Sequence, residues 1–380
     1  MNENDMLRHV LSYPGLFDAI FDGLTQTAQT AVPDTVLDQI DSVYIYGSGD
    51  SLNAANCVIQ AFREYAHVSA CAVPALEASR YLAAFTLPEQ AARTLTICVS
   101  SSGEAPRSAE AAMNLRKAGF LTMAVTANPD SCVGHAVEYI FTAQAPAFSA
   151  ASIPLPGIRS FVPPVIGLYL LAVRLGLRRG ILTQKQGQAV CAELAGLADI
   201  LRVAMKTGAE VMSRFAALCG RCERMEFLAA GPSRGAADFG VSKVLEAQGY
   251  SVLSQDLEEF AHQTFFSNDT GQLPTVLLIP SRGRSRQRAM EILLIVQRLE
   301  RPVLVMTDDP AVLEGWTGIE SLCLCKPVSE PLISLVFACL MAYLSAVMPL
   351  REGDVYMHGH QGVYCEDGLP TIRGSALAID

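Results

Sequence analysis

The chain contains the same pattern of strands, turns and helices twice, in two segments about 180 residues apart. Each copy begins with a short apolar strand that runs into glycine, at residues 43–49 and again at 227–233. A second apolar strand then ends in a small polar turn, at 95–103 in one copy and 276–283 in the other. The repeat therefore restricts the fold to two copies of one kind of domain.

In both copies the polar turn is followed by a helical pattern and a third strand. The helices are expected over 109–118 and 288–299, and the strands over 121–126 and 303–307. Continuous apolar strands that alternate with helices indicate a parallel sheet covered on both faces, with right-handed crossovers. The sequence predicts an α/β protein with two tandem, doubly wound parallel sheets.

The repeat also predicts how the chain is divided. We expect a helical N-terminal segment (1–40), a first α/β domain (41–190), a helical connection (191–220), a second α/β domain (221–350) and a C-terminal tail (351–380).

One apolar run could cross a membrane by its length. Residues 331–350 carry no charge after Glu330, and about 20 apolar residues suffice for a span. However, the helical pattern at 343–347 mirrors that at 169–173 in the first copy, and basic flanking loops are missing. We therefore expect a buried helix and no membrane partner.

Charge and cysteine content narrow the surroundings of the protein. There are 28 Lys and Arg against 38 Asp and Glu, so the net charge of -10 argues against nucleic acid as a partner. Eleven cysteines in 380 residues are too sparse for a disulfide scaffold, and the polar start of the chain lacks the pattern of a signal peptide. A cytoplasmic protein is expected.

The turns of the first copy are the candidate binding residues, because open parallel sheets bind ligands beyond the carboxyl ends of their strands. Gly49 and Ser51 lie in the first turn, and Ser100, Ser101 and Ser102 lie in the second. Hydroxyl groups and backbone N–H groups just before a helix suit a small dianion such as phosphate. The simpler alternative is that these serines only cap the helix.

Cofactor and metal binding are not expected. The first turn has Leu52 where a dinucleotide fingerprint needs a third glycine, and no ribose-binding acid follows at the usual distance. Cys219 and Cys222 have the spacing of zinc ligands, but a second pair at zinc-finger distance is missing.

The second copy has diverged at the corresponding turn, where Pro280, Ser281 and Arg282 stand. One phosphate site per chain is therefore expected. The alternating arginines that follow are left unassigned, because such a pattern is more often a solvated edge than an anion site; they are Arg282, Arg284, Arg286 and Arg288.

The turns resemble those of the SIS (sugar isomerase) family, which includes the isomerase half of glucosamine-6-phosphate synthase. The run from Ser100 to Glu104 resembles the family's Ser-Gln-Ser-Gly-Glu-Thr phosphate loop, and the run from Gly49 to Ser51 resembles its Gly-Thr-Ser turn. The resemblance spans roughly residues 43–354 in two copies and implies the flavodoxin-like SIS fold and phosphate-binding roles for these serines.

A second part of the resemblance carries the chemistry. Lys243 to Glu246 resembles the family's Lys-Leu-Lys-Glu, and the run ending at His262 resembles its Glu-Leu-Lys-His, with the histidine 16 positions after Glu246 as in the family. The resemblance implies that Glu246 moves a proton between C1 and C2 of a sugar phosphate and that His262 assists ring opening. Lys243 would stabilise developing negative charge. It also implies a homodimer whose subunits share the sites.

The residues themselves allow simpler alternatives. Lys243 and Glu246 share a helical face and could be an exposed ion pair, although a desolvated carboxylate is also a competent general base. Asp256 and Glu259 fit a capping box, so Glu259 is expected to be structural. His262 considered alone would be an ordinary core or surface histidine.

Several positions depart from the family pattern. Ala105 replaces a threonine of the phosphate loop, and Phe239 replaces an acid seven residues before Glu246. The synthase's Lys-Ser-Val-Thr ending has no counterpart; His358 and His360 stand nearby, and either could replace its lysine or belong to a mobile tail. No glutamine-hydrolysing domain precedes the repeat, so glutamine-dependent synthesis is not expected.

The resemblance and the residues together predict an enzyme that acts on a sugar or amino-sugar phosphate. Isomerisation, deamination and deglycation can all begin with the same proton abstraction, so Glu246 does not separate them. The alternative is a phosphosugar sensor without turnover, although residues 1–40 show no basic helix-turn-helix pattern.

Overall fold

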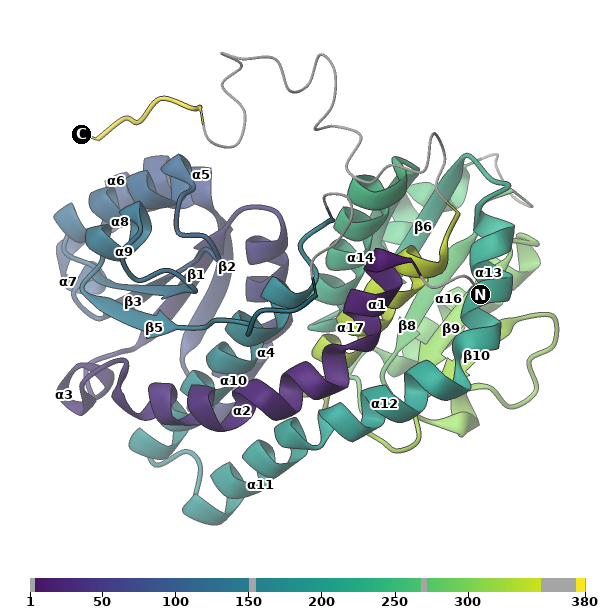
Figure 1. Cartoon of the computed structure of the whole chain (residues 1–380), viewed down its shortest axis with the longest axis horizontal. Coiled ribbons are helices and arrows are strands. Elements are labelled where there is room, and N and C mark those ends of the chain that lie inside the picture. The colour runs from purple at the N-terminus through teal and green to yellow at the C-terminus, as the bar shows by residue number, and fades with distance from the viewer. Residues whose placement is uncertain (1–3, 150–154, 268–271, 350–373, 380) are drawn as a thin grey trace. The chain divides into compact units, whose positions relative to one another are not determined.

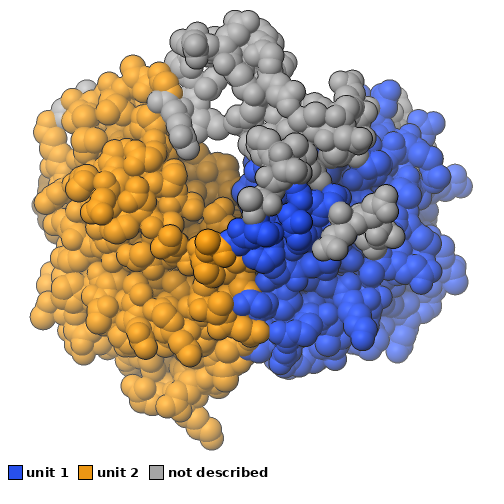
Figure 2. All heavy atoms as spheres, in the orientation of Figure 1, with its two compact units in different colours: residues 1–15, 148–158, 196–361 blue, residues 16–147, 159–195, 362–380 orange. Residues whose placement is uncertain are grey.

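The chain forms two compact units, which Figure 2 colours separately. In this computed structural model, residues 4–149, 155–267, 272–349 and 374–379 are described. Unit 1 comprises Met1–Gly15, Phe148–Ile158 and Gly196–Gln361, and unit 2 comprises Leu16–Ala147, Arg159–Ala195 and Gly362–Asp380. Each unit is built from three separate stretches of the chain. The linear domain boundaries expected from sequence stay a prediction.

Unit 2 contains the first sheet, a parallel sheet of five strands. Its order is β2-β1-β3-β4-β5, in which the chain starts inside the sheet and winds outward in both directions. The strands are β1 (Ser42–Gly47), β2 (Ser69–Pro74), β3 (Thr94–Val99), β4 (Leu121–Thr126) and β5 (Tyr139–Thr142). The helices are α2 (Tyr13–Thr30), α3 (Asp34–Leu37), α4 (Asp50–Ala66), α5 (Ala75–Glu77), the π-helix η1 (Ala78–Leu82), α6 (Ala83–Phe85), α7 (Pro88–Ala91), α8 (Pro106–Lys117), α9 (Cys132–Ala136), η2 (Arg159–Phe161), α10 (Val162–Arg178) and α11 (Gln184–Ala195).

Unit 1 repeats this topology. Its sheet has the order β10-β9-β8-β6-β7, which is the same winding read from the other edge. The strands are β6 (Arg224–Ala229), β7 (Ser251–Asp256), β8 (Thr275–Ile279), β9 (Val303–Thr307) and β10 (Glu320–Cys323). The helices are α1 (Asp5–Leu11), α12 (Leu197–Thr207), α13 (Ala209–Cys219), α14 (Ser233–Gln248), α15 (Leu257–His262), η3 (Thr264–Phe266), α16 (Arg286–Arg298), η4 (Pro310–Val312) and α17 (Glu330–Val347). The predicted α/β class with two doubly wound parallel sheets is confirmed.

Helices cover both faces of each sheet, as Figure 1 shows. In unit 2, α4 packs against α10 on one face, while α8, α9 and η1 build an apolar core on the other. In unit 1, α14 packs against α17, and α15 and α16 enclose a core on the opposite face. This layering explains why the central strands are apolar on both sides.

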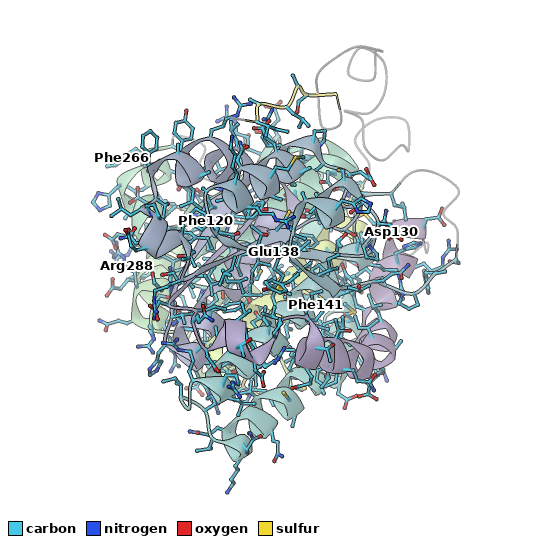
Figure 3. The ribbon with its side chains drawn as sticks, turned by 90° about the vertical axis from the view of Figure 1, so that its left-hand side faces the viewer. Phe120, Asp130, Glu138, Phe141, Phe266 and Arg288 are labelled. Atoms are coloured by element: carbon cyan, nitrogen blue, oxygen red, sulfur yellow. The ribbon has the colours of Figure 1, made fainter. Side chains whose placement is uncertain are left out.

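The long apolar helices α10 and α17 are core elements of their units. Each is long and apolar enough to cross a membrane by length and composition alone, and 89% of the relevant window is buried in each case. Glycine permits their close packing: a Cβ at Gly167 of α10 would lie 2.7 Å from the ring of Phe141, which Figure 3 labels, and one at Gly240 of α14 would lie 2.6 Å from Met341 of α17. The expected burial holds for residues 331–346, whereas Val347 is only partly buried and Pro349 is exposed.

Candidate functional site

The first turn of unit 2 is a close approach between a strand end and a helix start. Strand β1 ends at Gly47, and α4 begins at Asp50 after Gly49, which has φ +56 and ψ −129. A Cβ at Gly47 would lie 2.6 Å from the Cβ of Ser51 and 3.1 Å from the carbonyl oxygen of Val99. Glycine is therefore required here, and the turn that carries Ser51 lies against the end of β3.

The second turn follows β3 and leads into α8. Ser100 is buried, Ser101 is partly buried and Ser102 is exposed. Gly103 has φ +71, and its carbonyl oxygen accepts hydrogen bonds from the backbone N–H of Val133 and from the Cys132 thiol, both at 3.0 Å. These contacts hold the turn in one shape while its serine side remains open.

Strands β1 and β3 are adjacent and parallel, so unit 2 places both turns at the same edge of its sheet. The sequence-predicted residues Gly49, Ser51, Ser100, Ser101 and Ser102 therefore gather where the N-termini of α4 and α8 supply partial positive charge. Any anion there would be held by N–H and hydroxyl donors.

The two units differ in whether these donors are already occupied. In unit 1, the backbone N–H and the hydroxyl of Ser281 donate to Asp308 at 2.6 and 2.9 Å, and the N–H of Arg284 donates to Glu330 at 3.0 Å. In unit 2, the backbone N–H groups of Ser101 and Ser102 have no acceptor among the described residues. Asp308 thus takes both donors of Ser281, the counterpart of Ser101, whose own N–H is open. The next two positions differ less: the N–H of Arg282, like that of Ser102, has no acceptor among the described residues, and the N–H of Glu104, the counterpart of Arg284, donates to the Ser102 hydroxyl at 3.3 Å.

The sheet register explains this difference. Ile279 pairs with Thr307 in unit 1 as Val99 pairs with Val125 in unit 2, so Asp308 corresponds to Thr126. Thr126 has a hydroxyl group in place of the carboxylate and uses it toward the carbonyl oxygen of Ser101, at 3.4 Å. The N–H side of the unit 2 turn therefore stays available.

Lys243 and Glu246 lie one turn apart on α14 and form an ion pair of 2.6 Å. The Lys243 side chain is fully buried, whereas that of Glu246 is 35% exposed. The ammonium group also donates to the carbonyl oxygen of Gly157 at 2.9 Å and lies 5.1 Å from the ring centre of Phe239. The pair is thus half-buried rather than fully exposed, and Lys243 fixes one carboxylate oxygen of Glu246, Oε2, in place.

His262 lies at the end of α15 with 67% of its side chain exposed. Its Nε2 lies 3.2 Å from Glu258, which also binds Arg288 at 2.8 Å. Figure 3 labels Arg288 at the edge of the molecule. Within one chain, the carboxylate that contacts the His262 ring is therefore that of Glu258 and not that of Glu246.

The start of α15 confirms half of the expected capping box. The Asp256 side chain accepts a hydrogen bond from the N–H of Glu258 at 2.8 Å, so Asp256 is the N-cap. Glu259 instead accepts from the Gln263 side chain at 2.7 Å, because it lies on the outer face of this short helix. The prediction that the Glu259 side chain reaches back to the backbone N–H of Asp256 was therefore wrong.

The alternating arginines after β8 are largely engaged with acids. Arg284 lies 3.8 Å from Glu330, Arg286 lies 3.3 Å from Asp309, and Arg288 binds Glu258 and Glu291. These pairs agree with a solvated edge rather than an anion site.

Sequence reasoning missed a buried carboxylate on α8. The Glu110 side chain is fully buried and accepts hydrogen bonds from Ser79 at 2.5 Å, from Arg80 at 2.8 Å, from Arg107, and from the backbone N–H of Ala378 at 2.6 Å. Burial raises the pKa of Glu110, but these hydrogen bonds outweigh it and lower the pKa to about 2. The only signal in the sequence was that Glu110 follows Arg107 by one helical turn, which predicts an ion pair. The other partners of Glu110 are distant in sequence and leave no local pattern.

We predict that Glu110 makes unit 2 sensitive to acid. A depressed pKa contributes stability above the unfolded value of about 4.3, and this contribution is lost as pH falls toward 2. Over that range the free energy of unfolding of the wild-type chain should fall by roughly 2 kcal/mol more than that of the Glu110→Gln variant. Solvent that screens the charges around Glu110 makes this difference smaller. Urea unfolding between pH 5 and pH 2 measures this. Equal pH dependence of the two proteins would contradict the assignment.

His358 and His360, for which the sequence left open a role in place of the synthase lysine or a place in a mobile tail, lie outside the described residues. Within the described ranges, no three His, Cys, Asp or Glu side chains are grouped so that they could hold a metal ion.

Each unit has a doubly wound parallel sheet of the kind found in SIS domains, and comparison with known proteins agrees with this fold. No family model matches the chain. The isomerizing glutamine–fructose-6-phosphate aminotransferase of Tropheryma whipplei is 29% identical over 183 residues, which is 46% of this chain and 28% of that protein. The chain thus matches less than a third of the length of this curated relative.

Solved structures extend the likeness over nearly the whole chain. The C-terminal domain of glucosamine-fructose-6-phosphate aminotransferase from Francisella tularensis superposes with a TM-score of 0.77 at 16% identity, covering 93% of this chain and 97% of that one. Tagatose-6-phosphate ketose/aldose isomerase from Escherichia coli gives a TM-score of 0.62 at 15% identity, covering 90% of each chain. The chain has the fold of these proteins, and the resemblance to the isomerase half of the synthase is confirmed.

Proposed function

We propose that this protein is an enzyme that binds a phosphorylated sugar or amino sugar and transfers a proton between C1 and C2, as a deglycase, a deaminase or an aldose–ketose isomerase. The observation that carries the proposal is the contrast between the two turns. After β8 the N–H and the hydroxyl of Ser281 are taken by Asp308, whereas after β3 the N–H of the corresponding Ser101 has no acceptor among the described residues. The sugar-phosphate names of the similar proteins support the same class of ligand.

We assign the phosphate to unit 2. The N–H groups of Ser101 and Ser102 point to an acceptor that the described protein does not supply, and the hydroxyls of Ser51, Ser100 and Ser102 add donors. Gly49 contributes backbone that no side chain obstructs, since a Cβ there would meet nothing within 4 Å. A dianion would satisfy several donors at once, which a merely structural turn does not need.

We assign the proton transfer to Glu246 in unit 1. Its Oε2 receives the hydrogen bond of the Lys243 ammonium, which leaves Oε1 as the oxygen that would take the proton. The fixed positive charge of Lys243 would hold the carboxylate in one orientation and stabilise negative charge that develops on an enediol or enolamine. No metal or cofactor is invoked, because a base and a nearby positive charge suffice for this step.

Proton NMR in D₂O tests the proposal. Purified protein is mixed with sugar 6-phosphates, amino-sugar 6-phosphates and phosphorylated sugar–amine adducts, and the C1 and C2 protons and released products are followed. We expect deuterium uptake or product formation with one of these classes, and the reacting class separates isomerase from deaminase and deglycase. Phosphate-dependent line broadening without any exchange would show that the protein is a sensor and not an enzyme. If neither line broadening nor exchange is seen, the phosphate assignment is overturned.

We further propose a cytoplasmic homodimer in which His262 acts at the site of the neighbouring subunit. Its 67% exposure and its contact with Glu258 leave it accessible to a second copy. We predict that mixing Glu246→Gln with His262→Gln chains restores about a quarter of the wild-type sites, because one of the two sites in each mixed dimer keeps both residues. Activity of co-refolded or co-expressed variants measures this.

Two controls accompany this mixing experiment. Each variant alone should stay inactive under the same conditions, and light scattering should show dimers. Mixed dimers without regained activity would show that His262 does not act across the interface.

A further inference from the structure

A C-terminal segment of the chain lies along helix α8 in unit 2; it is drawn in yellow beside the label C in Figure 1. Most of its hydrogen bonds are made by main-chain atoms; the Ser375 hydroxyl also accepts from Arg107, at 3.4 Å. The N–H of Ala378 donates to Glu110 at 2.6 Å, and the carbonyl oxygen of Ala378 accepts from the Asn114 side chain at 3.1 Å. The carbonyl oxygen of Ala376 accepts from Arg107 at 3.1 Å.

The helix residues that make these contacts form one continuous row. Arg107, Glu110 and Asn114 are spaced three and four residues apart, so they project from the same face of α8. The row alternates groups that bind carbonyl oxygens with a group that binds an N–H. This order is the complement of an extended peptide main chain, which presents both kinds of group along its length.

The side chains of the segment contribute less. Leu377 is 46% exposed and Ile379 is 52% exposed, whereas Ser375 and Ala378 face inward. A hollow of about 180 Å³ lies near the C-terminal end of α8, lined in part by Ser79, Arg80 and Asn114; no residue of the segment lines it. The segment therefore meets α8 through its backbone and through the partly buried residues Ser375 and Ala378.

Glu110 makes this recognition specific. Its carboxylate is fully buried and charged, so each lost hydrogen bond leaves charge that water does not reach. Ser79, Arg80 and Arg107 supply three donors from unit 2 itself, and the N–H of Ala378 supplies a fourth. A hydrogen bond to a charged group of this kind is stronger than one between neutral groups.

We propose that the groove between α8 and η1, here called the tail groove, is a recognition site for an extended peptide main chain, and that residues 374–379 of the chain itself occupy it. The site is separate from the proposed phosphate turn, although the same helix α8 begins directly after that turn. The proposal therefore stands or falls independently of phosphate binding.

A peptide that binds in trans tests this proposal. A chain ending at Arg373 is titrated into a fluorescein-labelled peptide of residues 374–380, and fluorescence anisotropy is recorded. We expect saturable binding to the shortened chain and none to the full chain, whose groove is already filled. Equal binding to both chains, or none to a correctly folded shortened chain, would overturn the proposal.

Two N-methylated peptides provide a matched comparison. N-methylation at Ala378 removes the donor to Glu110 and should lower affinity at least about tenfold. N-methylation at Ala376 removes an N–H that has no acceptor among the described residues and should have a much smaller effect. Equal losses of affinity for the two peptides would show that Glu110 does not recognise the main-chain N–H of Ala378.

The full chain provides a measurement that does not depend on truncation. Hydrogen exchange should find the amide of Ala378 protected, and Asn114→Ala should speed its exchange severalfold, whereas Arg116→Ala, on the exposed side of the same helix, should leave it unchanged. An amide at Ala378 that exchanges as fast as an unstructured one in the wild-type chain would overturn the proposal.

Discussion

Replacing Glu246 by glutamine is expected to lower kcat by about a thousandfold while phosphosugar affinity changes by less than about threefold. An amide oxygen cannot accept a proton from carbon, whereas it can still accept the hydrogen bond of Lys243 at nearly the same place. Because substrate phosphate is assigned to the turns of unit 2, binding should persist. Steady-state kinetics together with ligand titration by NMR measure both quantities.

The control for this variant is Glu259→Gln, the same chemical change at an exposed glutamate of the same unit. It should leave kcat within about twofold, since Glu259 contacts only Gln263 among the described residues. The Lys243 ammonium is fully buried, so Glu246→Gln also removes the charge that compensates it, and thermal unfolding must confirm a folded variant. Full turnover by a folded Glu246→Gln protein would discard its role as the base.

Replacing Gly103 by alanine is expected to lower phosphosugar affinity at least about tenfold and to destabilise unit 2 by about 3 kcal/mol. Gly103 has φ +71, and an added Cβ would lie 1.8 Å from the Ser131 hydroxyl oxygen and 3.2 Å from that of Thr126. The turn must therefore move, and the N–H groups of Ser101 and Ser102 move with it. Isothermal titration and urea unfolding report the two effects.

Gly119, at the end of α8, provides a closely matched control. It also has positive φ, at +88, but an added Cβ there would meet nothing within 4 Å. Gly119→Ala should therefore cost only the backbone strain, about 1 kcal/mol, and leave affinity unchanged. Equal affinity losses in the two variants would show that the shape of the turn at Gly103 is not what binds the phosphosugar.

The fold was predictable because its signals are local and repeated. Apolar strands that end in small polar turns, at 95–103 and 276–283, occur in both copies and match β3 and β8. The repeat also resolved the apolar run at 331–350, which by itself resembles a membrane span. A helix that recurs at the same place in both copies is explained most simply as a buried helix, and 89% of the apolar window of α17 is buried.

The candidate site was predictable only as residue types at fixed spacings. The positions of Ser100, Ser101 and Ser102 before a helix were readable, as was the shared face of Lys243 and Glu246. At α15 the Asp256 N-cap was readable too, but the reciprocal contact of Glu259 was not, because Glu259 turns outward on a short helix and binds Gln263. A side chain often has several polar neighbours within reach. The spacing of residues along the chain does not determine which of them it hydrogen-bonds, because this depends on the three-dimensional geometry.

The sequence by itself determined the doubly wound architecture, the turns at the strand ends and the polar residues in them, because hydrophobic period and turn chemistry act over short stretches. Only the tertiary structure decided which donors remain open. Asp308 reaches Ser281 through strand register, and Glu330 reaches Arg284 from a helix 46 residues further on. In the same way Ala378 reaches Glu110 across 268 residues. Such contacts arise from packing of distant segments, and no local pattern encodes them.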